Sequence, residues 1–368
     1  MEIERMHRKY GPVVRITPAE IHVRDPVFYH ELFVMGAVRK MEAYPRFAEG
    51  TGFEGNLIPI IATRLKIEKN LLILNEDMVA VSTTHDMHRV TRALLNPFFS
   101  IAGIARVEER AVQRVEQLRS RLNGFVNTGI PVNITHAFNS LMTDIVSCML
   151  FEEPSDYLND PTFNAEWFEV LKKGAVTIPL LAHMPWFAKL LVMPVVRALS
   201  ERITKWRIWD DKARRQMVKS RLRPADEAKN RSDTTFFDHL VHSDLVESIF
   251  GNGGFSRLSQ TPISMTNHWI HMDADIFPDP RKFEPERWLG NQDKVKLMYD
   301  YFVPFSKGSR ACLAKNLVDM TIYHTIGKLY GPLAPRMILH ETNEDAVRPV
   351  HGLLFPFPQL DSPGDDKR

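Results

Sequence analysis

The residues best suited to chemistry in this sequence of 368 residues lie around Cys312, one of only two cysteines. Residues 305–312 read Phe-Ser-Lys-Gly-Ser-Arg-Ala-Cys, and the apolar residues that follow recur at roughly helical spacing, at Leu317, Met320 and Ile326. The cysteine therefore lies in a glycine-containing loop at the entrance to a helix. Helix N-termini carry partial positive charge and unpaired N–H donors, which stabilise a thiolate and suit it to be a metal ligand.

Three neighbours of Cys312 have chemistry that fits such a site. Gly308 permits a tight turn, and Phe305 is placed to shield the sulfur from water. Arg310 is placed to pair with an anionic group on the same ligand. The loop is thus expected to present one sulfur ligand with a cation beside it.

The elements that must hold this loop are mostly helices. Apolar residues recur at helical spacing in residues 106–123 and 136–150. Before them, residues 11–23 alternate apolar and polar side chains between Gly and Pro, which predicts a small hairpin. The second helix contains Cys148, which we interpret as a small buried hydrophobe. The expected fold class is mainly α with a small β region.

The composition predicts a globular chain and names no partner. Hydrophobic residues make up 44% of the sequence, enough for a sizeable core. The 47 Lys and Arg residues against 45 Asp and Glu leave a net charge of +2, which does not indicate nucleic-acid binding. Acidic residues are interleaved in the basic run 205–231, so we interpret it as a solvated surface. Two cysteines are too few for a disulfide framework.

The sequence shows no membrane-spanning pattern. Its first ten residues are charged where an anchor would need an apolar run. The most apolar stretch, residues 176–199, contains three prolines and is expected to form short, broken helices. Its apolar faces fit contact with a membrane surface, an apolar channel or ordinary core packing, and these alternatives stay open.

The cysteine loop resembles that of the haem-thiolate monooxygenases, the cytochrome P-450 superfamily, whose pattern is Phe-x-x-Gly-x-Arg-x-Cys. Ala314 stands where the family usually has glycine. Residues 277–288 resemble the family's meander, and residues 264–273 resemble the strand and turn that lead into it. Residues 10–16 are similar to its first strand. The overall likeness is closest to oxygenases of fungal secondary metabolism, of the trichodiene-oxygenase type.

The resemblance implies a cofactor site and a reaction. Cys312 would be the axial ligand of the iron of haem b. The remaining cofactor-binding residues would be His88, Arg92, Arg257, Phe305, Gly308 and Arg310, with the first three binding haem propionates. The family inserts one oxygen atom from O2 into an apolar small molecule and takes electrons from an NADPH-dependent reductase. It implies the cytoplasmic side of the endoplasmic reticulum, although this chain, lacking an anchor, would be soluble or peripheral.

Two parts of the family's pattern are not found in the sequence. One is the central oxygen-activating helix with its acid-threonine pair; residues 232–236 imitate the pair without an apolar helix around it, and we interpret them as a decoy. The other is the Glu-x-x-Arg helix expected before residues 256–258. Arg287 of the meander would then lose a buried partner. An internal deletion of this kind indicates a mis-spliced gene model or a decayed gene copy.

We therefore expect one haem-thiolate-type domain over residues 1–368. Residues 1–250 would form its N-terminal helical part, and residues 251–368 would hold the meander, the cysteine loop and the following helix. Residues 361–368 are expected to be a disordered polar tail.

Three other functions remain as alternatives. The first is a catalytically dead or mis-spliced family member that binds haem weakly or not at all. The second is a zinc hydrolase, and the third is a structural helical scaffold. The zinc ligands would be His268, His271 and Asp273. Residues 267–271 have strand-to-turn character, whereas helical zinc pairs usually need i,i+4 spacing.

Overall fold

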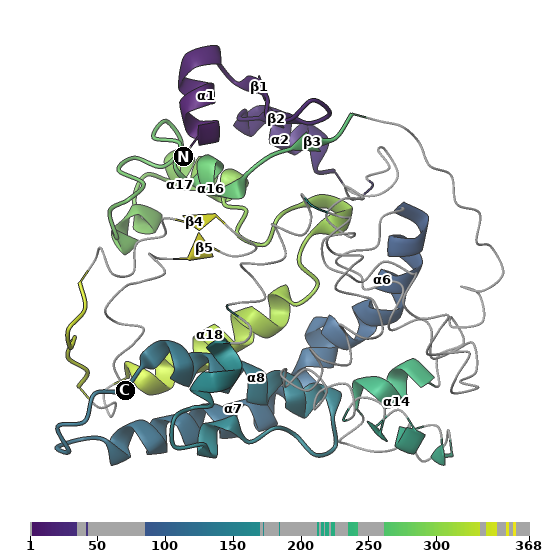
Figure 1. The fold of residues 1–368 in the computed structure, drawn as a ribbon, viewed down its shortest axis with the longest axis vertical. Coiled ribbons are helices and arrows are strands. Elements are labelled where there is room, and N and C mark those ends of the chain that lie inside the picture. Colours follow the sequence, from purple (N-terminus) through teal and green to yellow (C-terminus); the bar gives the residue numbers. More distant parts are fainter. Residues whose placement is uncertain are drawn as a thin grey trace. The chain divides into compact units, whose positions relative to one another are not determined.

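The computed structural model describes residues 2–34, 85–169, 235–241 and 261–331, several residues between 212 and 224, and short pieces at 336–343, 351–352 and 356–357 (Figure 1). Single residues at 42, 172 and 184 are also described. The described part is mainly helical with small sheets, as the sequence predicts. The chain divides into two compact units, which are taken here one at a time.

The first unit comprises Met1–Tyr44, Thr84–Arg89 and Gly253–Cys312. Its described elements are short: α1 (Glu2–Tyr10), β1 (Val13–Arg15), β2 (Ile21–Val23), α2 (Pro26–Leu32), β3 (Ile263–Ser264), α16 (Asn267–His271), η3 (Pro285–Leu289), α17 (Gln292–Tyr301) and η4 (Gly308–Arg310).

A three-stranded sheet joins the two ends of this unit. Strands β1 and β2 pair antiparallel with Val14 opposite His22, which confirms the predicted hairpin. Strand β3 pairs parallel with β2, with Ile21 opposite Ile263. The sheet therefore brings residues near the N-terminus to the segment that leads into the meander.

The prediction of strand-to-turn character for residues 267–271 is wrong, because they form the helix α16. Trp269 and Ile270 are adjacent in sequence and both buried. A strand would point them to opposite faces, whereas one helical turn lets both face the interior.

The second unit is built on longer helices. Helix α6 (His85–Phe99) crosses the division between the units, since the first unit ends there at Arg89. The other described elements are α7 (Ile101–Gly124), α8 (Ile134–Leu150), η2 (Tyr157–Asn159), α14 (Phe236–Val241), α18 (Lys315–Leu329), β4 (His351–Gly352) and β5 (Pro356–Phe357).

The core of the second unit lies where α7 packs against α8 and α18 (Figure 1). Helix α7 buries residues at the predicted helical spacing, and Val115 and Leu118 are fully buried. Cys148 on α8 is 5% exposed, which confirms it as a core residue. The buried Asp144 carboxylate accepts hydrogen bonds from the Tyr157 and Leu158 backbone N–H groups, at 3.0 and 2.9 Å, and so ties η2 to α8.

None of the helices among the described residues is long and apolar enough to cross a membrane. Residues 176–199, apart from one, and the tail 361–368 lie outside the described residues, so the expectations for them stay predictions.

Candidate functional site

The cysteine loop is a tight, internally bonded turn in the first unit. The Ser306 N–H donates to the Val303 carbonyl at 3.0 Å, and the Cys312 N–H donates to the Phe305 carbonyl at 2.8 Å. Ser306 and Gly308 have positive φ angles of 58° and 73°. The Cys312 thiol is free and exposed. The loop thus fixes the main chain around the sulfur and leaves the sulfur accessible, three residues before α18 begins.

Gly308 meets both a conformational and a packing requirement. Its φ of 73° is one that side chains rarely adopt. A Cβ atom there would lie 2.7 Å from the Val34 carbonyl oxygen and 2.8 Å from the Phe33 carbonyl carbon. The turn prediction for Gly308 is therefore confirmed, and the close approach of the chain after α2 adds a second reason for glycine.

Side chains of α2 and a main-chain carbonyl of α17 hold the loop from outside. The hydroxyls of Tyr29 and Ser306 are hydrogen-bonded at 3.0 Å. The Lys307 ammonium donates to the Asp300 carbonyl at 2.5 Å and to His30 Nδ1 at 3.1 Å. Burial raises the pKa of Tyr29 and lowers the pKa of Lys307. The sequence reasoning missed Tyr29 and His30, which lie about 270 residues before the loop and carry no local signal.

Helix α16 contacts the start of the loop through two side chains. The Val303 N–H donates to His271 Nε2 at 2.9 Å, and the Asn267 side-chain amide donates to the Val303 carbonyl at 3.0 Å. The His271 ring lies between Phe277 and Phe302, at centroid distances of 5.8 and 5.5 Å. Burial, with the neighbouring His268 as a smaller cause, lowers the pKa of His271.

Arg287 is well bonded within the meander, and the expected loss of its partner from a Glu-x-x-Arg helix stays a prediction. Its guanidinium donates to four backbone carbonyls of the meander: those of Pro278, Asp279, Lys282 and Glu284, at 2.7, 3.2, 2.9 and 3.2 Å. Its side chain is 12% exposed. The meander curls around the guanidinium, and the Glu284 carboxylate also lies 3.9 Å from it.

The two predicted propionate ligands on α6 lie four residues apart and therefore on one face of the helix. His88 is buried and Arg92 is half-buried. His85, one turn before His88, is also buried, and within the described residues its Nδ1 atom has no hydrogen-bond partner. Arg257, the third predicted propionate ligand, lies outside the described residues.

The alternative sites proposed from sequence are not assembled. Among the described residues, no three His, Cys, Asp or Glu side chains are grouped to hold a metal ion. Of the decoy segment 232–236, Thr235 and Phe236 are described; Thr235 is buried and its hydroxyl donates to Asp238 Oδ2 at 2.9 Å. This bond ties Thr235 to the first turn of α14 and gives it a structural role.

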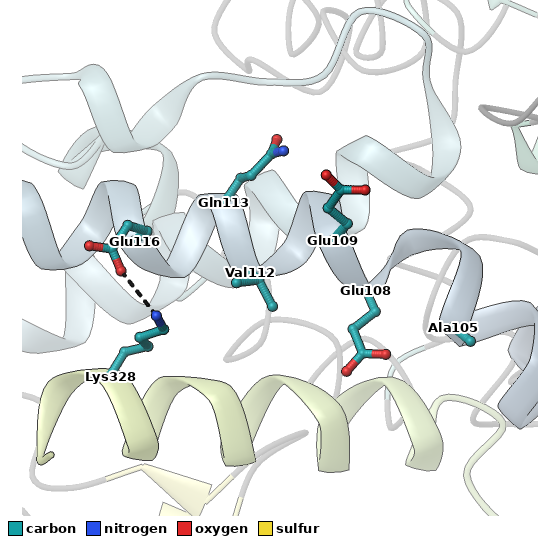
Figure 2. A pocket seen from close by; sticks show the side chains of 7 residues that line it. All are labelled: Ala105, Glu108, Glu109, Val112, Gln113, Glu116 and Lys328. Atoms are coloured by element: carbon teal, nitrogen blue, oxygen red, sulfur yellow. Dashed lines mark ion pairs between the residues drawn. The ribbon is translucent and has the colours of Figure 1, made fainter.

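The second unit has an open groove between α7 and α18 (Figure 2). It is lined by Glu108, Glu109 and Glu116, with Lys328 paired to Glu116 at 3.6 Å. Beside it, His324 of α18 is bonded to Glu108 at 2.8 Å. A groove with this charge does not suit an apolar small molecule.

Comparison with known proteins finds similarity to cytochrome P450 proteins. The family model for cytochrome P450 matches residues 258–329, which hold the meander, the cysteine loop and α18. Curated proteins align with nearly the whole chain. A fusicoccadiene C-8 hydroxylase from Alternaria brassicicola is 29% identical over 99% of this chain and 84% of its own length. The chain is therefore similar to cytochrome P450 proteins, through the family model at residues 258–329 and through these relatives over nearly its whole length.

Other P450 relatives have similar coverage. The P450 monooxygenase oblB of Emericella variicolor is 29% identical over 99% of the chain and 82% of its own length. A tryptophan 6-hydroxylase, fscE, of Fusarium equiseti is 26% identical over 99% and 85%. The alignment with the Alternaria protein spans 469 positions, 101 more than the residues of this chain. The relative therefore carries residues at 101 or more positions where this chain has none.

Haem iron is the cofactor of the P450 family, and the donor set fits it. Cys312 offers an exposed sulfur on a bonded turn, with the Arg310 guanidinium two residues away. On α6, a buried imidazole and a half-buried guanidinium share one face, and the unbonded His85 Nδ1 adds a buried polar atom to that helix. A thiolate can ligate the haem iron, and an imidazole and a guanidinium can each donate hydrogen bonds to the two haem propionates.

Proposed function

We propose that this chain is a P450 monooxygenase that oxidises an apolar small molecule, a terpenoid or similar compound, in fungal secondary metabolism, and that Cys312 would hold the iron of haem b. The observation that carries the proposal is the exposed Cys312 thiol on a closed turn, in a chain that aligns over 99% of its length with fungal P450 monooxygenases. The name of one of them, a fusicoccadiene C-8 hydroxylase, supports the substrate class.

Each proposed site residue has a separate task. His88, Arg92 and Arg257 would donate hydrogen bonds to the haem propionates, and Arg310 would neutralise one of them. The sulfur is exposed in the structure, so Phe305 would limit its contact with water only in the haem-loaded protein; Gly308 allows the turn that aims it. The Cys312 N–H is already bonded to the Phe305 carbonyl, so the sulfur is aimed by a main chain that does not need to rearrange.

The reaction requires O2, the substrate and electrons from an NADPH-dependent reductase. When bound, haem supplies the activation of O2, which the side chains of the protein do not provide. No acid-threonine pair is assigned as catalytic. We place the protein at the cytoplasmic side of the endoplasmic reticulum, with residues 176–199 as the segment that contacts the membrane surface. Both compact units together would form the single haem-thiolate-type domain over residues 1–368.

The carbon monoxide difference spectrum of the reduced, haem-loaded protein tests the role of Cys312. A thiolate-type Soret band is expected for the wild type and for Cys148→Ala, whose buried cysteine serves as the matched control. Cys312→Ser is expected to lose the band, because a hydroxyl does not replace the thiolate. If the wild type lacks the band, the alternative holds: a dead or mis-spliced family member that binds haem weakly or not at all.

The site of the missing residues is a separate proposal. We place them between residues 245 and 262, where the sequence lacks the oxygen-activating and Glu-x-x-Arg helices. Sequencing the transcript across this segment tests it. A longer transcript that encodes both helices would identify a gene-model error, and a transcript identical to the present sequence would identify a true deletion.

A further inference from the structure

Val303 is held at both of its main-chain polar groups by side chains of one helical turn. Its N–H donates to His271 Nε2 at 2.9 Å, and its carbonyl accepts from the Asn267 amide at 3.0 Å. Asn267 and His271 are the first and last residues of α16, four apart, so they project from the same face. Val303 itself is 2% exposed. Most buried backbone groups pair with other backbone groups, so this pairing to two side chains is unusual.

Val303 is also the residue from which the cysteine loop begins. Its carbonyl accepts a second hydrogen bond, from the Ser306 N–H at 3.0 Å, which closes the first turn of the loop. The next bond, from the Cys312 N–H to the Phe305 carbonyl, closes the loop around the sulfur. A displacement of Val303 is therefore passed to Phe305 and Cys312 through the main chain.

We propose that Asn267 and His271 are positioning residues that set the path of the cysteine loop and so the direction of the Cys312 sulfur. The part of the inference that concerns iron rests on the proposed function; the part that concerns the loop does not. Neither side chain touches the sulfur, and both act through Val303.

The hydrogen bonds fix the form of His271 that this task needs. Because Val303 is the donor, Nε2 must be unprotonated, and the proton of the neutral ring is on Nδ1. The Phe277 and Phe302 rings both contact the imidazole ring. The lowered pKa of His271 favours the same neutral form.

The hydrogen bond to Val303 also gives His271, one of the two histidines that suggested a zinc site, a structural role. His271 accepts a hydrogen bond from the main chain of Val303, whereas His268 is exposed on the same short helix and makes no bond to Val303. His268 is therefore a matched control, since it shares the helix and residue type with His271 but not the contact.

The test compares three variants as proteins without haem: His271→Ala, His271→Gln and His268→Ala. Amide hydrogen exchange is measured over residues 303–312, together with the rate at which iodoacetamide alkylates Cys312, with the buried Cys148 as internal reference. His271→Ala is expected to speed exchange at Val303 and Ser306 about tenfold and to change the alkylation rate of Cys312. The Gln side chain keeps an acceptor and is expected to restore most of the protection.

Unchanged exchange over residues 303–312 in His271→Ala would overturn the inference. So would an equal effect of His268→Ala, or faster exchange spread evenly over the first unit, which would make His271 a general stabilising residue. In the haem-loaded protein, His271→Ala is expected to lower the thiolate-type fraction of the reduced carbon monoxide spectrum. If the wild type shows no such band, the proposed function fails, and so does the part of the inference that concerns iron. The part that concerns the path of the cysteine loop is then tested by the exchange data alone.

Discussion

The two units are stabilised in different ways. The second buries large apolar side chains along long helices, with residues such as Val115 and Leu118 at 0% exposure in one continuous core. The first has short elements and a small apolar cluster around Tyr29, Ile270 and Val303, and it relies on side chains that bond to main-chain groups. Apolar packing tolerates small changes in the orientation of the packed elements, whereas hydrogen bonds to main-chain groups fix the orientation of the chain that they hold. The second unit also has side-chain bonds to the main chain, at Asp144 and Arg121, but the unit that carries the cysteine has the smaller apolar cluster beside its bonds.

The largest expected effect is a cavity in the second unit. Leu118→Ala removes a fully buried side chain where α7 packs, and we expect a loss of about 3 kcal/mol in the free energy of unfolding. Leu222→Ala is the matched control, because Leu222 is 81% exposed and the change should cost under about 0.5 kcal/mol. Urea denaturation of both variants measures the difference. Equal losses would contradict the assignment of this core.

Arg287→Lys tests whether the first unit depends on directional hydrogen bonds to main-chain carbonyls. Lysine keeps the charge but cannot reach four carbonyls with one ammonium, so we expect a loss of about 2 to 3 kcal/mol. Arg281→Lys, at an exposed position of the same meander, is expected to be neutral. Hydrogen exchange over residues 278–287 locates the effect. If charge alone holds the meander, both lysine variants will behave as the wild type.

The sequence predicted the second unit better than the first, because apolar burial along a helix leaves a periodic pattern in the sequence and hydrogen bonds between distant residues do not. Burial at Val107, Ala111 and Val115 follows the helical period and can be read within one segment. The contacts of the cysteine loop join Tyr29 to Ser306 and His271 to Val303, and hydrogen bonds between distant residues leave no period. The motif placed the loop and its glycine correctly, but not the side chains that hold it.

Gly308→Ala has an intermediate expected effect. The methyl group would meet the main chain of Phe33 and Val34 and would require a strained φ, so we expect a loss of about 2 kcal/mol. Gly327→Ala is the opposite case: it lies inside α18 with nothing within 4 Å of the new Cβ, and a gain of about 0.5 to 1 kcal/mol is expected. Thermal unfolding of both variants measures the expected loss and the expected gain in stability. A stabilising Gly308→Ala would refute the close approach.

The smallest expected effect is a pH dependence that belongs to the first unit. His7 Nδ1 donates to the Gly11 carbonyl at 2.8 Å, so its Nε2 accepts from His22 Nδ1 at 2.9 Å, and His22 Nε2 accepts from the Thr266 hydroxyl at 3.0 Å. Trp269 packs against both imidazole rings, at centroid distances of 5.5 and 4.8 Å. Burial and the neighbouring His7 lower the pKa of His22 from 6.5 to about 4.

Between pH 6.5 and 4 the unfolded chain therefore binds more protons at His22 than the folded chain does. The stability that this residue contributes is complete above pH 6.5 and is lost as the pH falls towards 4, by an amount on the order of 1 kcal/mol at pH 5. His22→Gln cannot titrate, so its thermal midpoint should change less between pH 7 and pH 5 than that of the wild type, even if it is lower at both. If the thermal midpoints of the two proteins fall equally between pH 7 and pH 5, protonation of His22 does not destabilise the first unit.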